Sequence, residues 1–116
     1  MPTENLYRNA EPPATGERFE TLLAHRNLVI ERIVSAAGVA PVEFNQPQDE
    51  WVLLAHGSAT LEVDGVAQSL GPGDHVFLPA GTPHRVLQAS HGAIWLAVHL
   101  HPVGDEAPDS QGAASA

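Results

Sequence analysis

The chain is 116 residues long and 43% hydrophobic, which is enough for one domain with one core. Fourteen acidic residues stand against five arginines and no lysine, so the formal net charge is −9. Such a surface repels nucleic-acid backbones and anionic lipids. The absence of cysteine excludes disulfides, thiolate metal ligands and cysteine nucleophiles.

The sequence shows no transport or membrane signal. Met1–Asn5 has neither the basic nor the apolar region of a secretory signal. No apolar run approaches the roughly 20 residues that cross a bilayer. We therefore expect a cytoplasmic protein without a nucleic-acid or membrane partner.

The chain is polar at both ends and β-rich between them. Residues 1–18 are rich in polar residues and proline, which predicts a flexible segment. Phe19–Ala24 suits either a strand or a single helical turn. Residues 103–116 are small and acidic, which predicts a disordered tail. Between them, β-branched and apolar runs predict strands at Leu28–Ser35, Trp51–His56, Ala59–Val63, His75–Leu78, His84–Gln88 and Ala93–His101.

Turn residues separate these runs. Asp64 and Gly65 follow Val63 and precede Val66, and this pair is a strong hairpin signal because both positions tolerate positive φ. Short strands at roughly ten-residue spacing predict a single all-β sandwich or barrel over residues 19–102.

The segment from Gly73 to His84 is the most informative part of the sequence. Two glycines and two prolines fix its turns, and it ends by placing His84 at the start of a strand. A histidine held rigidly at a strand end suits a metal ligand or a general base.

The same segment carries a family resemblance. Gly73, five residues, Pro79-Ala80-Gly81, two residues and His84 match the second motif of the cupin superfamily, although Gln88 stands where that motif ends in Asn. Of the first motif, Glu50 and Gly57 keep the family's separation. The chain resembles a group of small bacterial single-domain cupins, which implies a double-stranded β-helix, or jelly-roll β-barrel.

The resemblance also implies a metal site. Cupins hold one divalent ion with two His from the first motif, a Glu and a further His. Here Glu50 and His84 match, whereas the places of the paired histidines hold Phe44 and Gln46, or Glu43 and Asn45 if the gap before Glu50 is one residue longer. An amide oxygen is a weaker but legitimate ligand. The expected ligands are therefore Gln46, Glu50 and His84, around zinc, manganese, iron or nickel.

His99 is a further candidate, as a metal ligand or as a base. On Ala93–His101, Ile94, Leu96, Val98 and Leu100 alternate with Trp95, Ala97, His99 and His101. Parity favours the aliphatic set inside, which would leave His99 outside the barrel or at a dimer interface. The opposite orientation would place His99 in the cavity.

The same parity argument sorts the other candidate side chains. It predicts an inward set of Glu50, Val52, Leu54, His84, Val86 and Gln88. Trp51 and Arg85 are expected on the outer side, with Arg85 in a salt bridge. We interpret His75 as structural, and His25, His56, His91 and His101 as surface or strand-end residues.

Two functions follow from these residues. In the first, a divalent ion at Gln46, Glu50 and His84 acts as a Lewis acid on a small oxygenated molecule, with Glu50 or His99 as the catalytic group that moves protons. In the second, the barrel binds a small molecule without metal or catalysis. A homodimer is also expected, because Ala93–His101 would be a long strand to leave at a sheet edge.

Overall fold

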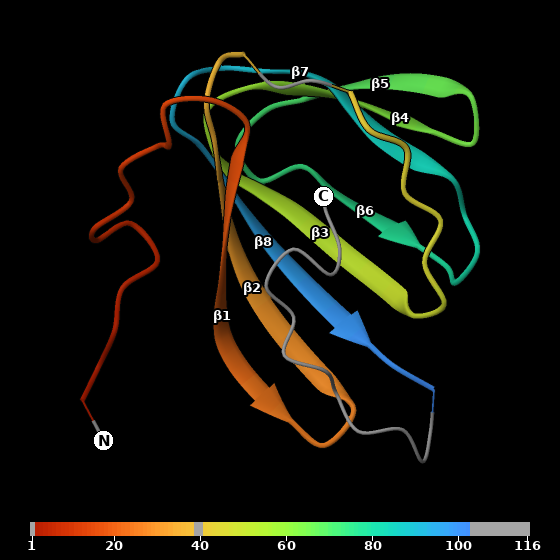
Figure 1. Cartoon of the computed structure of the whole chain (residues 1–116), viewed down its shortest axis with the longest axis horizontal. Coiled ribbons are helices and arrows are strands. Elements are labelled where there is room, and N and C mark those ends of the chain that lie inside the picture. The colour runs from red at the N-terminus through yellow and green to blue at the C-terminus, as the bar shows by residue number, and fades with distance from the viewer. Residues whose placement is uncertain (1, 39–40, 103–116) are drawn as a thin grey trace.

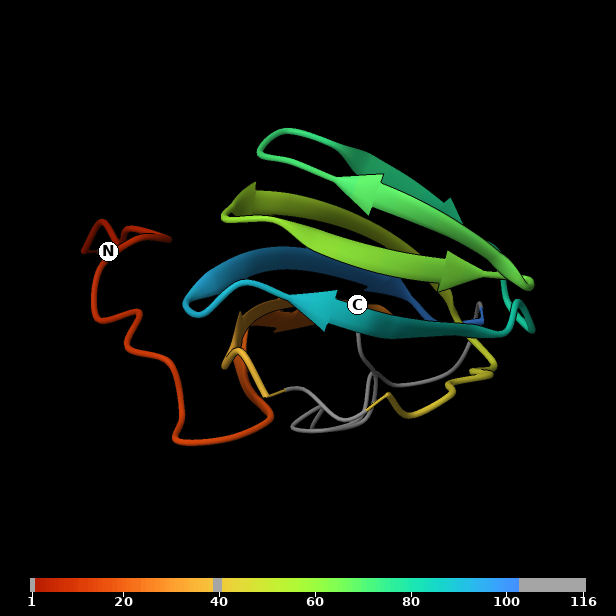
Figure 2. The ribbon, with the colours of Figure 1, turned by 90° about the horizontal axis from the view of Figure 1, so that it is seen from above.

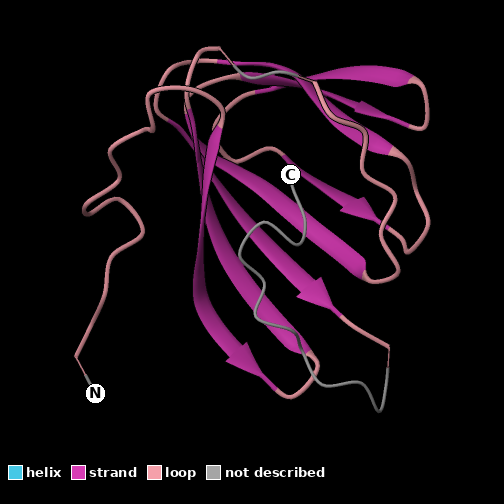
Figure 3. Ribbon diagram, in the orientation of Figure 1, coloured by secondary structure: helices cyan, strands magenta, loops and turns pink. Residues whose placement is uncertain are grey.

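The all-β prediction is confirmed by a computed structural model, which describes residues 2–38 and 41–102. Figure 3 shows strands and connecting loops in this part of the chain. No helix in it is long and apolar enough to cross a membrane. The described residues form the strands β1 (Glu17–His25), β2 (Leu28–Ser35), β3 (Asp49–His56), β4 (Ala59–Val63), β5 (Val66–Leu70), β6 (His75–Leu78), β7 (His84–Ala89) and β8 (Ala93–Leu100).

The strands form two antiparallel sheets. The larger has the order β1-β2-β8-β3-β6, and the smaller has the order β5-β4-β7. Figures 1 and 2 show the smaller sheet lying over one end of the larger one. The core is built from both, with Ile33, Leu54 and Trp95 from the larger sheet against Leu61 and Val86 from the smaller.

Local sequence explains most of these elements. The run that suited a strand or a helical turn is a strand, and β1 begins two residues before the predicted domain start at residue 19. Asp64 and Gly65 both have positive φ, 50° and 81°, as the hairpin prediction requires. β5, which completes that hairpin, was missing from the predicted strands. The predicted disordered tail, 103–116, lies outside the described residues.

Two predictions about β8 are wrong. Trp95, Ala97 and His99 face the interior, at 0–1% exposure, whereas Leu96, Val98 and Leu100 lie on the outer face. β8 is also not an edge strand, since it pairs with β2 on one side and β3 on the other. Large apolar residues stand at both parities of β8, with Trp95 on one face and Leu96 and Val98 on the other, so the alternation did not show which face is inside.

The N-terminal segment is attached to the outer face of the larger sheet through Arg32. The guanidinium donates to the carbonyl oxygens of Leu6, Arg8 and Asn9 at 2.7–3.1 Å. It also binds both carboxylate oxygens of Glu20, its register partner on β1. These bonds explain why an arginine with 5% exposure is tolerated on an apolar strand.

We expect Arg32→Ala to lower the free energy of unfolding by about 2–4 kcal/mol, because three carbonyls and Glu20 lose their donor. Arg85→Ala is the matched control. Arg85 pairs with Glu62 at 2.8 Å, as predicted, but its side chain is 41% exposed, so its loss costs at most about 1 kcal/mol. Chemical denaturation measures both. Equal losses in the two variants would contradict the role given to Arg32.

Candidate metal centre

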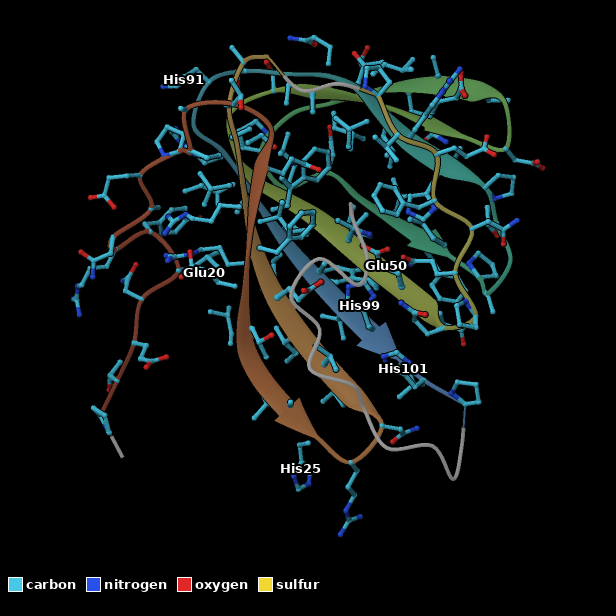
Figure 4. The ribbon with its side chains drawn as sticks, viewed as in Figure 1. Glu20, His25, Glu50, His91, His99 and His101 are labelled. Carbon is cyan, nitrogen blue, oxygen red and sulfur yellow. The ribbon has the colours of Figure 1, made fainter. Side chains whose placement is uncertain are left out.

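Six buried polar side chains gather at one end of the space between the sheets. They come from β2, from the segment before β3, and from β3, β7 and β8, with exposures between 0% and 7%. Figure 4 shows two of them, Glu50 and His99, side by side, as their register pairing on β3 and β8 requires. The set is Glu31, Gln46, Gln48, Glu50, His84 and His99.

The segment before β3 is held against the turn that leads to His84. Phe44 and His84 exchange both backbone hydrogen bonds, at 2.8 and 3.0 Å. The amide of Gly81, at a φ of 79°, donates to the carbonyl of Gln46. These contacts bring Gln46 to the same end of the barrel as His84, although the two are far apart in sequence.

Glu50, Gln46 and His84 form the first cluster. The amide Nε2 of Gln46 donates to Oε1 of Glu50 at 2.7 Å, and Nε2 of His84 lies 3.6 Å from the same oxygen. That second separation is long for a hydrogen bond. It is close to the distance of about 3.4 Å between two ligands of one tetrahedral ion with bonds of about 2.1 Å.

Local contacts fix the orientation of the His84 ring. Its Nδ1 lies 3.0 Å from the carbonyl oxygen of Thr82, an acceptor only, so Nδ1 carries the hydrogen. Nε2 is then the atom left facing Glu50, as in metal-bound histidines whose other nitrogen donates to a carbonyl. Phe44 stacks on the ring, with centroids 6.0 Å apart. Phe44, which stands at the position of one of the family's paired histidines, therefore supports the ring of His84, the histidine that this chain keeps.

His99 belongs to a second cluster beside the first. Its Nε2 lies 2.8 Å from Oε1 of Glu31, and its Nδ1 lies 3.4 Å from Nε2 of Gln48. Both ring nitrogens thus have partners in the fold. The interior position of His99 makes it a neighbour of Glu50, but its nitrogens are directed at Glu31 and Gln48.

Several oxygens of this group have no partner. Among the described residues, four buried side-chain atoms lack a hydrogen bond, and three of them are Oε2 of Glu31, Oε1 of Gln46 and Oε2 of Glu50. All three accept hydrogen bonds when the two carboxyls are ionised. A buried acceptor without a donor costs about 1–3 kcal/mol, so this end of the barrel is electrostatically suited to a cation or to a ligand that donates hydrogen bonds.

Burial sets the protonation of Glu50. The loss of water raises the pKa of its carboxyl from 4.5 to about 8, the hydrogen bond from Gln46 lowers it, and the charges of Glu31 and Glu17 raise it further. In the metal-free protein Glu50 therefore holds a proton at neutral pH. A cation bound beside it would displace that proton.

The predicted ligand set can be tested against this geometry. Within residues 2–38 and 41–102, no three side chains of the His, Cys, Asp and Glu types are grouped closely enough to hold a metal ion. A site around Glu50 and His84 therefore needs the amide oxygen of Gln46. The unpaired Oε1 of Gln46 and Oε2 of Glu50 supply donors of the right chemistry, so the residues fit a weak site with one nitrogen and two oxygen ligands.

Besides His99, the sequence prediction misplaced one further side chain, and it missed two. Gln88 was predicted inside but is exposed, because an irregularity between Thr60 and Leu61 in the β4–β7 register shifts the alternation before Ala89. Glu31 was overlooked within an apolar strand, although it shares parity with Val29 and Ile33. Gln48 was overlooked as well, although it shares parity with Gln46 and Glu50.

Comparisons with known proteins agree with this fold. Residues 30–99 match the sequence profile of the cupin domain. A Ralstonia eutropha protein, provisionally assigned as a mannose-6-phosphate isomerase, has 36% identity and a TM-score of 0.78 over 88% of this chain and 100% of its own. An RmlC-like cupin from Shewanella frigidimarina has 21% identity and a TM-score of 0.70, over 82% and 85%. No curated protein matches.

The chain belongs to the cupin family, and its two antiparallel sheets form the jelly-roll barrel of that family. A conserved protein of unknown function from Streptococcus pyogenes shares the fold at 22% identity, with a TM-score of 0.74 over 87% of this chain and 88% of its own. The family and fold predicted from the motif around His84 are thus confirmed.

Glu50 predicts how stability depends on pH when a chelator is present. Below about pH 4.5 its carboxyl is protonated in both the folded and the unfolded state. Between 4.5 and about 8 only the folded state keeps the proton, so the stability that the raised pKa provides is lost as pH rises through this window, by up to about 1.4 kcal/mol per unit. Glu50→Gln should remove this loss.

Chemical denaturation between pH 4 and 9 measures the effect, with Glu62→Gln as the control because Glu62 pairs with Arg85 outside the barrel. The stability of Glu50→Gln relative to the unmodified chain should increase with pH. A difference that does not change with pH would contradict the buried, protonated carboxyl.

Proposed function

We propose that this cupin binds one divalent metal ion through His84, Glu50 and Gln46, and that it binds or transforms a small oxygenated molecule at that ion. The observation that carries the proposal is the pairing of an oriented imidazole with unpaired buried oxygens on Glu50 and Gln46. The metal could be zinc, manganese, iron or nickel, since the donor set suits all four.

The bound ion would supply a Lewis acid that polarises an oxygen of the ligand. The chain's own residues have separate tasks. His84 is held by Thr82 and Phe44 so that its Nε2 faces the site. Glu50 gives up the proton on its carboxyl when a cation binds, and Gln46 holds the Glu50 carboxylate in place.

His99 and Glu31 are proposed to complete the site from the inner side. Their hydrogen bond of 2.8 Å fixes the imidazole next to Glu50 without using it as a ligand. His99 and Glu50 are accordingly the groups available to take or give protons during a reaction. The similar Ralstonia protein, with its provisional isomerase assignment, supports a metal-dependent reaction on an oxygen-rich substrate. We propose that this reaction takes place in the cytoplasm.

A metal-free binding function is the second candidate. It is favoured by the hydrogen bond that Gln46 already gives to Glu50. It is also favoured by the ligand set, because of the three histidines and one glutamate that the family uses, this chain has only His84 and Glu50. In that case the unpaired oxygens would accept hydrogen bonds from the ligand itself. A chelator separates the two functions, because only the metal-dependent protein loses thermal stability when it is added.

Titration calorimetry on chelator-treated protein should show one divalent ion per chain. Glu50→Ala and His84→Ala should weaken the affinity at least about tenfold. The control is His91→Ala, since His91 is exposed in the turn before β8. Gln46→Glu should strengthen binding because it adds a charged ligand, and a folding defect cannot produce that change.

The result that would contradict the proposal is a folded, unmodified chain that binds none of zinc, manganese, iron and nickel. Binding that is equally strong in His84→Ala and His91→Ala would also place the ion elsewhere. Circular dichroism of each variant shows whether the fold is retained.

A further inference from the structure

The polar cluster around Glu50 and His84 is closed to solvent. Its six side chains are at most 7% exposed, so neither an ion nor a small molecule reaches them in this conformation. A part of the barrel must therefore move before anything can bind to Glu50 or His84. The elements that carry the six side chains differ in how strongly the fold holds them.

Strand pairing holds four of these elements in place. β2 lies between β1 and β8, β8 between β2 and β3, and β3 between β8 and β6. β7 pairs with β4 from His84 to Ala89. Displacing any of these strands would break a ladder of backbone hydrogen bonds, so none of them is the part that moves.

The segment before β3, residues 41–48, is attached more weakly. Its pairing with β7 is one isolated bridge between Phe44 and His84, and the amide of Gly81 adds one backbone bond to Gln46. Among the described residues, the apolar cluster between the sheets contains no member of this segment. Regions with few buried apolar contacts open at a lower free-energy cost than the rest of a fold.

The same segment covers the polar cluster. Its two buried side chains, Gln46 and Gln48, belong to that cluster and contact Glu50 and His99. Figure 1 shows the segment in yellow, passing β7 and leading into β3. Its remaining side chains apart from Phe44 are exposed, and they are Pro41, Val42, Glu43, Asn45 and Pro47. The segment thus separates the cluster from solvent.

We propose that residues 41–48 form a lid, which moves away from β7 to admit an ion or a small molecule to Glu50 and His84 and then closes over it. The lid rests on the proposed function only for the identity of what enters. Opening breaks the bridge between Phe44 and His84 and withdraws Gln46, while Glu50 and His84 stay on their strands. Closure returns Gln46 to Glu50 and encloses the occupant.

A disulfide across the bridge tests the lid, because the chain has no cysteine of its own. Asn45 and Pro83 stand opposite each other, next to the antiparallel pair of Phe44 and His84. Neighbours of this kind are close enough for a disulfide. The variant Asn45→Cys with Pro83→Cys should hold the lid closed when it is oxidised and release it when it is reduced.

Two controls accompany this lid variant. Its own reduced form has the same substitutions and an unlocked lid. The variant Glu62→Cys with Ala67→Cys joins register partners on β4 and β5, so it carries a disulfide that does not involve the lid. Circular dichroism shows whether each variant keeps the fold.

Diethyl pyrocarbonate measures access without any metal, because it acylates the imidazoles that it can reach, and peptide mass spectrometry locates the product. In the unmodified chain, His84 should react at least about tenfold more slowly than the exposed His91. In the oxidised lid variant, His84 should react at least about tenfold more slowly again, and reduction should restore its rate. The disulfide between positions 62 and 67 should leave the rate at His84 unchanged.

Hydrogen exchange of the unmodified chain is the second measurement, and it needs no disulfide. The amides of Phe44, Gly81 and His84 donate the backbone bonds that opening breaks. They should exchange together, and before the amides in the ladders of β3 and β8.

Equal rates at His84 in the oxidised and reduced lid variant would overturn the proposal, because the reagent would then enter by another route. So would a His84 that reacts as fast as His91, since the cluster would then have no cover. Exchange of the three amides only together with those of β3 and β8 would also overturn it, because access would then require unfolding of the barrel.

The lid and the metal site can fail separately. A chain that binds none of the four ions but shows these acylation and exchange rates has the lid without the metal centre. Where an ion does bind, the oxidised lid variant should take it up and release it at least about tenfold more slowly, with an unchanged dissociation constant. An ion that binds and leaves equally fast in the oxidised and reduced forms would overturn the lid and leave the metal site in place.

Discussion

The burial of two carboxylates inside a small barrel is the constraint on which the rest of the site depends. Glu31 and Glu50 both have 0% exposure, and a charged group without water is costly unless it is paired or neutralised. Glu31 is paired with His99, and Glu50 is hydrogen-bonded by Gln46 and protonated through its raised pKa. Each still has one carboxyl oxygen without a hydrogen-bond partner, and these oxygens are of the type that binds a cation.

The alternation of side chains along the strands links this site to the outer surface. Glu50 faces the interior of the barrel and Trp51 the outer face of the larger sheet, just as His99 faces inward beside the outward Val98. A shift of the β3–β8 register by one residue would exchange the two faces. The pairing that brings Glu50 next to His99 therefore also places Trp51 next to Val98 on the outer face.

The sequence predicted the parts of the site that are fixed locally. The turn before His84 and the spacing from Glu50 to Gly57 are sequence patterns, and they identified the family and one of the two clusters. The position of His99 could not be read in this way, because β8 is apolar on both faces and its burial depends on neighbours distant in sequence. Gln88 was misplaced by a strand irregularity that no residue type signals.

An anomalous-scattering measurement on crystals soaked with zinc or manganese tests the central claim most directly. The account predicts one strong peak per chain within coordination distance of Nε2 of His84, a carboxylate oxygen of Glu50 and Oε1 of Gln46. A well-ordered crystal with no peak at this position, or with peaks only at surface histidines such as His91, would contradict the metal centre.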